Sequence, residues 1–261
     1  MIQKEFAKNA VEVLKNDDSV IGITAGGSWL TDELDEYSDL DLILVTKDKV
    51  AGNKEKMISY AGKMGNLLNA FTGEHVGDPR VLICLYDNPL LHVDIKFLTP
   101  EEFHKRVEDP FILHDTEDQL KNIIEKTEAK FPTPGFQWME DRFWTWVHYD
   151  LVKIGRGEYF EAHDGFAFFR DMILGPLIHI KNGNLPRGVR KVETHIAKEE
   201  LELLKRTIPQ YDRQSLIKTL EEVVSLYRKL REDVFTDDII LRTETESKVM
   251  EYFEKIKKEG V

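Results

Sequence analysis

The sequence predicts an α+β protein in which a small mixed β-sheet with helices is followed by a helical bundle. Apolar runs of strand length all fall within residues 1–110, whereas the rest of the chain carries long helical patterns. Between the two, residues 130–135 contain two prolines and a glycine, which interrupt both kinds of regular structure. We therefore expect two domains, covering residues 1–132 and 133–261.

The first domain is predicted to begin with an amphipathic helix and to continue with strands. Apolar residues recur at helical spacing over residues 2–14. Residues 20–23 predict a strand that ends in a glycine-rich turn, and residues 40–45 predict a second strand. An apolar stripe over residues 57–71 has helical spacing and predicts a further helix.

A β-hairpin and a capped helix are predicted next, followed by the bundle. Residues 81–86 and 91–98 read as two strands joined by the turn Asp87-Asn88-Pro89. A helix should begin after Thr99, with Pro100 at its first position and Glu102 completing a capping box. Five helical patterns predict the bundle: residues 138–154, residues 159–180, a segment from residue 197, residues 215–232 and residues 243–258.

The composition narrows the partners that the chain can have. No apolar run approaches the roughly 20 residues of a membrane helix, and the N-terminus has no signal-peptide core, so we expect a cytoplasmic protein without a membrane partner. The single cysteine, Cys84, excludes an intrachain disulfide and a multi-cysteine zinc site. A net charge of −12 without a basic cluster argues against long nucleic acids. A small molecule is the expected partner.

A glycine-rich turn and two carboxylates flank the start of the second predicted strand. Gly26, Gly27 and Ser28 follow the first strand, and Asp39 and Asp41 begin eleven residues beyond Ser28. Strand residues two apart point to the same face, so the two carboxylates lie side by side and repel each other unless a cation intervenes. Mg²⁺ prefers such oxygen ligands, and glycine N–H groups together with the serine hydroxyl suit phosphate.

The later hairpin supplies a third carboxylate. Polar and apolar side chains alternate over residues 91–98, and Asp94 lies on the polar face, which can lie beside Asp39 and Asp41. Three converging carboxylates can hold one or two divalent ions and so assist an in-line displacement at phosphorus. We therefore predict that Asp39, Asp41 and Asp94 are catalytic residues and metal ligands.

These residues resemble the signature of the polymerase-β-type nucleotidyltransferase superfamily. That signature is a strand, a Gly-Ser turn, a D-x-D triplet that opens the next strand and a later third aspartate. Gly27, Ser28, Asp39, Asp41 and Asp94 match it residue by residue. A catalytic domain followed by a helical domain of similar length is also similar to the aminoglycoside 6-adenylyltransferases and the lincosamide nucleotidyltransferases.

The resemblance implies a role for each domain. The 1–132 domain would be the catalytic nucleotidyltransferase domain, and the 133–261 domain would bind the acceptor and part of the nucleotide. Phe143-Trp144 and the segment from Lys153 to Ala162 resemble the aromatic and Lys/Arg-Gly-Glu segment of these relatives.

The resemblance also implies the reaction and the nucleotide contacts. A nucleoside monophosphate would pass from an NTP, with ATP expected, to a hydroxyl of an aminoglycoside- or lincosamide-like antibiotic. Mg²⁺ would be required, pyrophosphate released and antibiotic resistance conferred. Gly27 and Ser28 would hold the phosphates, and Lys153 with Arg156 would bind the nucleotide from the second domain.

The chain departs from its kanamycin-modifying relatives at the general base. Those relatives carry a glutamate one helical turn before the lysine, where this chain has Tyr149. The base role then passes to Asp94, with Glu158 as an acceptor-binding residue or alternative base. Lys153, Arg156 and Glu158 also fit an ordinary charged helix end.

Two other functions stay open. One is a nucleotidyltransferase that modifies a protein or a nucleic acid. The other is a non-catalytic nucleotide-binding regulator of the same fold. The presence of all three aspartates favours an enzyme over the regulator.

Overall fold

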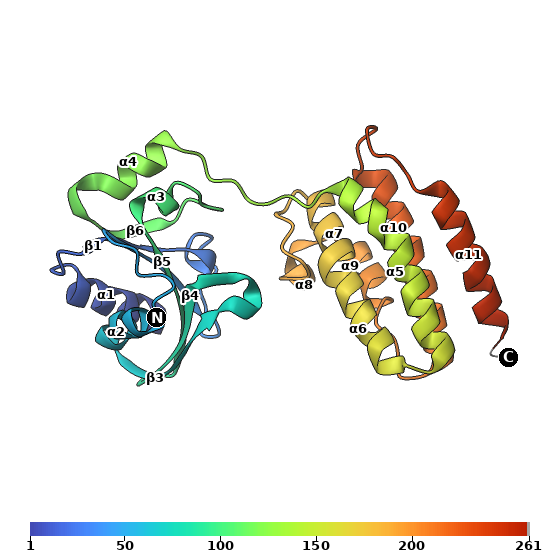
Figure 1. The fold of residues 1–261 in the computed structure, drawn as a ribbon, viewed down its shortest axis with the longest axis horizontal. Coiled ribbons are helices and arrows are strands. Elements are labelled where there is room, and N and C mark those ends of the chain that lie inside the picture. Colours follow the sequence, from blue (N-terminus) through green and yellow to red (C-terminus); the bar gives the residue numbers. More distant parts are fainter. Residues whose placement is uncertain (260–261) are drawn as a thin grey trace. The chain divides into compact units, whose positions relative to one another are not determined.

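The computed structural model describes residues 1–259 and confirms the predicted α+β fold class (Figure 1). The chain divides into two compact units, one covering Met1–Pro132 and one beginning at Thr133. The first unit contains a mixed sheet with helices, and the second is helical. Among the helices of residues 1–259, none combines the length and the apolar character that a membrane span requires.

The sheet of the first unit has six strands in the order β3-β4-β5-β2-β1-β6. β2 and β5 run parallel, and the other neighbouring strands are antiparallel. The strands are β1 (Val20–Ala25), β2 (Leu40–Thr46), β3 (Asn66–Gly73), β4 (Asp78–Asp87), β5 (Leu91–Leu98) and β6 (Phe111–Asp115). The predicted hairpin is therefore present as β4 and β5.

The two faces of the sheet are covered differently. Helices α1 (Ile2–Leu14) and α2 (Lys54–Met64) pack on one face, against a core that includes alternate residues of β2 and β5: Leu40, Leu42, Leu44, Val93, Ile95 and Phe97. Helices α3 (Pro100–Phe103) and α4 (Gln119–Lys126) cover one end of the opposite face, in a smaller core that includes Val45, Leu98, Phe103 and Leu120. Because strand residues alternate between faces, Asp41 and Asp94 point to this second face.

The prediction of one helix over residues 57–71 was wrong beyond Met64. Helix α2 ends there, Gly65 is extended, and β3 begins at Asn66. The backbone of β3 pairs with that of β4, and this pairing stabilises a strand where the apolar spacing of the sequence also fits a helix.

Strand β6 and helix α4 were not predicted. The Asp115 carboxylate accepts the backbone N–H groups of Leu120 and Lys121 and so holds the start of α4. A spacing of five and six residues lies outside the usual capping motifs, which explains why no helix start was visible in the sequence.

The second unit is a bundle in which α5 packs against α6, α10 and α11, and α10 also packs against α6 and α7. Its helices are α5 (Phe136–Arg156), α6 (Tyr159–Phe169), α7 (Gly175–Lys181), α8 (Val192–His195), α9 (Lys198–Lys205), α10 (Arg213–Val234) and α11 (Thr243–Lys258). The helix predicted over residues 159–180 is α6 and α7 joined by a π-helical segment, Arg170–Leu174.

A buried carboxylate ties three of these helices together. Glu140 of α5 accepts hydrogen bonds from the Tyr227 hydroxyl at 2.5 Å and the Arg231 guanidinium at 3.3 Å, both on α10. It also accepts the backbone N–H of Arg242, directly before α11, at 2.8 Å. A buried charge that is paired and hydrogen-bonded in this way fixes the relative positions of the helices.

Candidate active site

The glycine-rich turn packs directly on one of the predicted catalytic aspartates. The Gly26 N–H donates to the backbone carbonyl of Asp41 at 3.0 Å. Gly27 begins a short 3-10 helix with a φ of +59°, and a Cβ at this position would lie 2.1 Å from Asp41 Oδ2. Only glycine fits both the backbone conformation and the space. The turn from Gly26 to Ser28 and Asp41 therefore form one structural element.

The sheet register brings two of the three predicted carboxylates together. In the parallel pair of β2 and β5, Asp41 lies directly opposite Asp94, so both side chains share the second face. Asp39 lies one residue before β2 begins at Leu40. Burial raises the pKa of the Asp94 carboxyl, His92 opposes the rise, and the negative charge of Asp39 adds to it. The His92 Nε2 atom lies 2.9 Å from Asp94 Oδ1.

The donor set fits an open divalent-cation site in which the protein supplies only some of the ligands. Across residues 1–259, no three His, Cys, Asp or Glu side chains are gathered closely enough to hold a metal ion by themselves. Mg²⁺ is commonly held by one or two carboxylates, with substrate phosphates and water completing the shell. The opposed pair Asp41 and Asp94, next to a turn that suits phosphate, matches this arrangement.

Glu108 is a site residue that the sequence did not reveal. It lies in the loop between α3 and β6, and its Oε1 atom accepts the Gly27 N–H at 2.8 Å. A Cβ on Gly26 would lie 2.9 Å from the same oxygen. The Glu108 carboxylate thus accepts a hydrogen bond from a backbone N–H group that the turn would otherwise donate to a phosphate. No local motif signals a contact across 81 residues of chain.

We expect Glu108→Gln to strengthen the binding of inorganic tripolyphosphate to the full-length protein. Glutamine keeps the shape but removes a negative charge that opposes a bound phosphate. The loss of one charge-assisted hydrogen bond, worth about 1 kcal/mol more than a neutral one, predicts a dissociation constant about fivefold lower. Titration calorimetry of both proteins with tripolyphosphate measures this dissociation constant. Glu125→Gln on α4 is the control that removes the same charge elsewhere in the unit, and weaker binding by Glu108→Gln would contradict the expectation.

The predicted nucleotide-binding residues of the second unit form an ionic cluster where α5 meets α6. The Lys153 Nζ atom lies 2.9 Å from Glu158 Oε2 and 3.0 Å from Glu161 Oε2. Arg156 Nε lies 2.8 Å from Glu158 Oε1. The hydrogen bonds to Glu158 and Glu161 raise the pKa of Lys153. The Lys153 ammonium also lies 4.8 Å from the centre of the Tyr149 ring. Contact of Lys153 or Arg156 with a triphosphate stays a prediction.

Asp150 is a carboxylate of α5 that packs against α6. It is 2% exposed, and a Cβ on Gly165 of α6 would lie 2.2 Å from its Oδ1 atom. Burial raises the pKa of Asp150 to about 8, and the negative charge of Glu161 adds to the rise. At neutral pH the side chain is therefore mostly protonated. This position suits a close contact between two helices better than an open general base.

We expect Asp150→Asn to remove a pH dependence from the stability of the second unit. A folded pKa near 8 and an unfolded pKa near ~3.9 mean that the native protein loses stability as pH rises from about 4 to about 8. At ~1.4 kcal/mol per pKa unit, the native protein loses roughly 3–4 kcal/mol of stability between pH 5 and pH 8, and the asparagine variant lacks this loss. Denaturant unfolding at both pH values, followed by tryptophan fluorescence, measures the difference. Parallel pH dependences would contradict the assignment.

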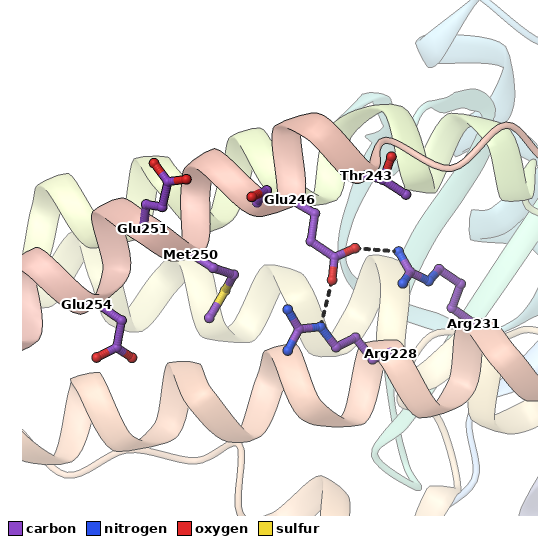
Figure 2. A pocket seen from close by; sticks show the side chains of 8 residues that line it. Arg228, Arg231, Thr243, Glu246, Met250, Glu251 and Glu254 are labelled. Atoms are coloured by element: carbon purple, nitrogen blue, oxygen red, sulfur yellow. Dashed lines mark hydrogen bonds and ion pairs between the residues drawn. The ribbon is translucent and has the colours of Figure 1, made fainter.

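A surface groove between α10 and α11 is a separate feature of the second unit. It has a volume of about 590 Å³ and is lined by residues such as Thr243 and Met250. Glu246 of α11 accepts hydrogen bonds from Arg228 at 2.8 Å and from Arg231 at 2.9 Å (Figure 2). These guanidinium groups are already neutralised, so the groove is a poor triphosphate site.

Comparison with known proteins supports an assignment for the first unit. Residues 7–130 match the model of the nucleotidyltransferase domain family, which spans nearly all of that unit. No curated protein matches the chain significantly.

Three solved structures are similar over most of the chain. An aminoglycoside 6-adenyltransferase from Bacillus subtilis has 15% identity and a TM-score of 0.42, covering 97% of this chain and 98% of its own. A nucleotidyltransferase-like protein from Exiguobacterium sibiricum has 14% identity and a TM-score of 0.38, covering 88% and 75%. A spectinomycin adenyltransferase from Enterococcus faecialis, solved with ATP and spectinomycin, has 12% identity and a TM-score of 0.30, covering 98% of each chain. The similarity of the first unit to the nucleotidyltransferase domain family depends on the match of residues 7–130, and not on the identities or TM-scores of these three structures.

Proposed function

We propose that this enzyme, whose residues 7–130 form a nucleotidyltransferase domain, transfers a nucleoside monophosphate from an NTP to a hydroxyl of a small molecule and releases pyrophosphate. The observation that carries the proposal is the register of β2 and β5, which sets Asp41 opposite Asp94 beside the Gly26–Ser28 turn. Two like-charged groups held this close on one face are suited to a divalent cation and its phosphate ligands.

Each predicted site residue has a defined role in this proposal. Asp39, Asp41 and Asp94 would hold Mg²⁺, as one or two ions, and the metal would supply charge stabilisation at the reacting phosphate. Ser28, and Gly27 once its N–H exchanges Glu108 for phosphate, would donate hydrogen bonds to the terminal phosphates, which become the pyrophosphate.

The second unit would contribute to substrate binding. Lys153 and Arg156 would bind the nucleotide, and for this they must exchange their ion pairs with Glu158 and Glu161 for contacts with phosphate. Glu158, once released, would be able to bind a cationic group of the acceptor.

ATP and a cationic, polyhydroxylated acceptor are the substrates that we propose. The net charge of −12 suits a cationic small molecule. The names of two structural neighbours, which act on aminoglycosides and spectinomycin, suggest antibiotics as the first compounds to test. A cytoplasmic antibiotic-modifying enzyme is consistent with these features.

The decisive experiment is a mass-spectrometric screen for nucleotide transfer. Pooled aminoglycosides and lincosamides are incubated with the protein, each NTP and Mg²⁺. A compound that gains the mass of one nucleoside monophosphate supports the proposal. Label that appears on the protein itself or on RNA would support a macromolecule-modifying enzyme instead. Tight ATP binding without any transfer would favour a regulator.

We expect ATP to bind at least tenfold more tightly with Mg²⁺ than with EDTA. Without a cation, the carboxylates of Asp39, Asp41 and Asp94 repel the triphosphate, and a tenfold change corresponds to only ~1.4 kcal/mol. Calorimetric titration under both conditions measures the ratio. Equal affinity would rule out a cation between the carboxylates and the phosphates.

A further inference from the structure

The row of side chains that contains Asp41 and Asp94 continues across the sheet as an apolar surface. Asp94 of β5 lies opposite Ile83 of β4, and Ile83 lies opposite Phe71 of β3. Directly opposed residues of neighbouring strands share a face. Asp41, Asp94, Ile83 and Phe71 therefore form one row across four strands. Leu85, two residues beyond Ile83, points to the same face.

This apolar surface, here called the strip and made of Phe71, Ile83 and Leu85, is open. Phe71 is 42% exposed and Leu85 is 39% exposed. Leu82 and Cys84, which alternate with them on β4 but face α2, are 0% and 1% exposed. The strip is contiguous on two neighbouring strands and is bordered by Asp94 and His92, and contiguous apolar patches with a polar rim are a feature of ligand-binding grooves.

The helices of the first unit leave this part of the face accessible. The small core under α3 and α4 is centred on β1, β2 and the end of β5, with Val45 and Leu98 among its members. The strip belongs to β3 and β4, at the other edge of the sheet. Phe71 is flanked by the His75 ring of the short 3-10 helix Glu74–Val76, with ring centres 5.7 Å apart, and still keeps 42% of its surface exposed.

The order of elements across the sheet assigns the two reactants to opposite sides. The Gly26–Ser28 turn follows β1, the carboxylates are on β2 and β5, and the strip is on β4 and β3. In an in-line displacement the attacking and the leaving oxygens lie on opposite sides of the phosphorus. With the leaving pyrophosphate held at the turn, a reaction axis that follows the row of side chains would bring the attacking hydroxyl in from the side of the strip.

We propose that the strip binds the acceptor, and that the acceptor is a small hydroxylated molecule with an apolar face beside the hydroxyl that reacts. This inference rests on the proposed function. The hydroxyl oxygen forms a bond to the α-phosphorus while the bond from that phosphorus to the bridging oxygen breaks. Pyrophosphate leaves with the electron pair of the broken bond, and the hydroxyl proton passes to the carboxylate of Asp94, which adjoins the strip. His92, opposite Leu85, bounds the strip.

A binding experiment tests the strip without requiring turnover. Full-length protein with ¹³C-labelled isoleucine, leucine and valine methyl groups is saturated with Mg²⁺ and a non-hydrolysable ATP analogue. The pooled lincosamides and aminoglycosides are then added. We expect the methyl signals of Ile83 and Leu85 to shift, while those of Leu90, which is 66% exposed in the β4–β5 turn, stay in place.

A kinetic experiment follows with any compound from the pool that gains mass in the transfer screen. Phe71→Ala and Leu85→Ala each remove apolar contact area and are expected to raise the KM of this acceptor about tenfold. The KM of ATP should change by less than about twofold, and Leu90→Ala is the matched control.

Several results would overturn the proposal. Strip methyl signals that stay unchanged while the ATP analogue binds would reject the strip and leave the proposed function standing. A raised KM for ATP alone would assign the strip to the nucleobase, and a dimer that Phe71→Ala dissociates would assign it to a second copy of the chain. Failure of the ATP analogue to bind at all would count against the proposed function itself.

Discussion

Asp41→Asn is expected to reduce nucleotide transfer by about 10³-fold or more while the fold stays intact. A metal held by these carboxylates would lower the free energy of the charged transition state by several kcal/mol, and each ~1.4 kcal/mol is a factor of ten in rate. Asparagine has nearly the same shape, so it still fits against Gly27 in the space next to the turn. It has no negative charge with which to hold a cation opposite Asp94.

Thermal unfolding separates this effect from a structural one. Asp41 and Asp94 are like charges on one face, and removal of one of them relieves a repulsion in the protein without metal. The melting temperature of Asp41→Asn should therefore equal or exceed that of the wild type. Asp48→Asn, in the exposed loop after β2, is the control that should keep both activity and stability. A large drop in melting temperature for Asp41→Asn would indicate a structural role.

The sequence predicted those parts of the site that depend on local spacing. The two-residue period of a strand placed Asp94 on a polar face, and the turn residues Gly27 and Ser28 had a recognisable composition. The register that sets Asp41 opposite Asp94 depends on parallel pairing between distant strands. Sequence alone could make that proximity plausible but could not specify the opposed pair.

The sequence did not reveal features that depend on contacts between distant segments. Glu108 reaches Gly27 from a loop without a motif. Lys153 is paired with Glu158 and Glu161 because Gly157, with a φ of +76°, lets the chain turn from α5 into α6. The sequence indicated a charged helix end at the end of α5, but it did not show which of the charged side chains form ion pairs. For the fold, the helical spacing over residues 57–71 concealed β3, because a leucine-rich strand and a helix can share an apolar pattern.

Asp94→Asn is expected to lower turnover by about 10²-fold or more while Mg²⁺·ATP still binds. This is the effect of removing a general base and keeping the substrate contacts. Asp94 adjoins the strip from which the acceptor hydroxyl would approach, and its carboxylate contacts His92. If Asp94 serves chiefly as a metal ligand, the affinity for ATP and the turnover should fall together. Calorimetry and steady-state kinetics on the same variant distinguish the two roles.

Glu158→Gln is the paired variant, because Glu158 is the rival base in the second unit. Both of its carboxylate oxygens are already engaged by cations, Oε2 by Lys153 and Oε1 by Arg156, whereas a general base must be free to contact the acceptor hydroxyl. We therefore expect Glu158→Gln to retain turnover within about tenfold of the wild type, a smaller loss than the roughly 100-fold or more that removal of a general base causes. If Glu158→Gln instead loses turnover with ATP bound, and Asp94→Asn loses ATP binding, the base belongs to the second unit and Asp94 is a ligand.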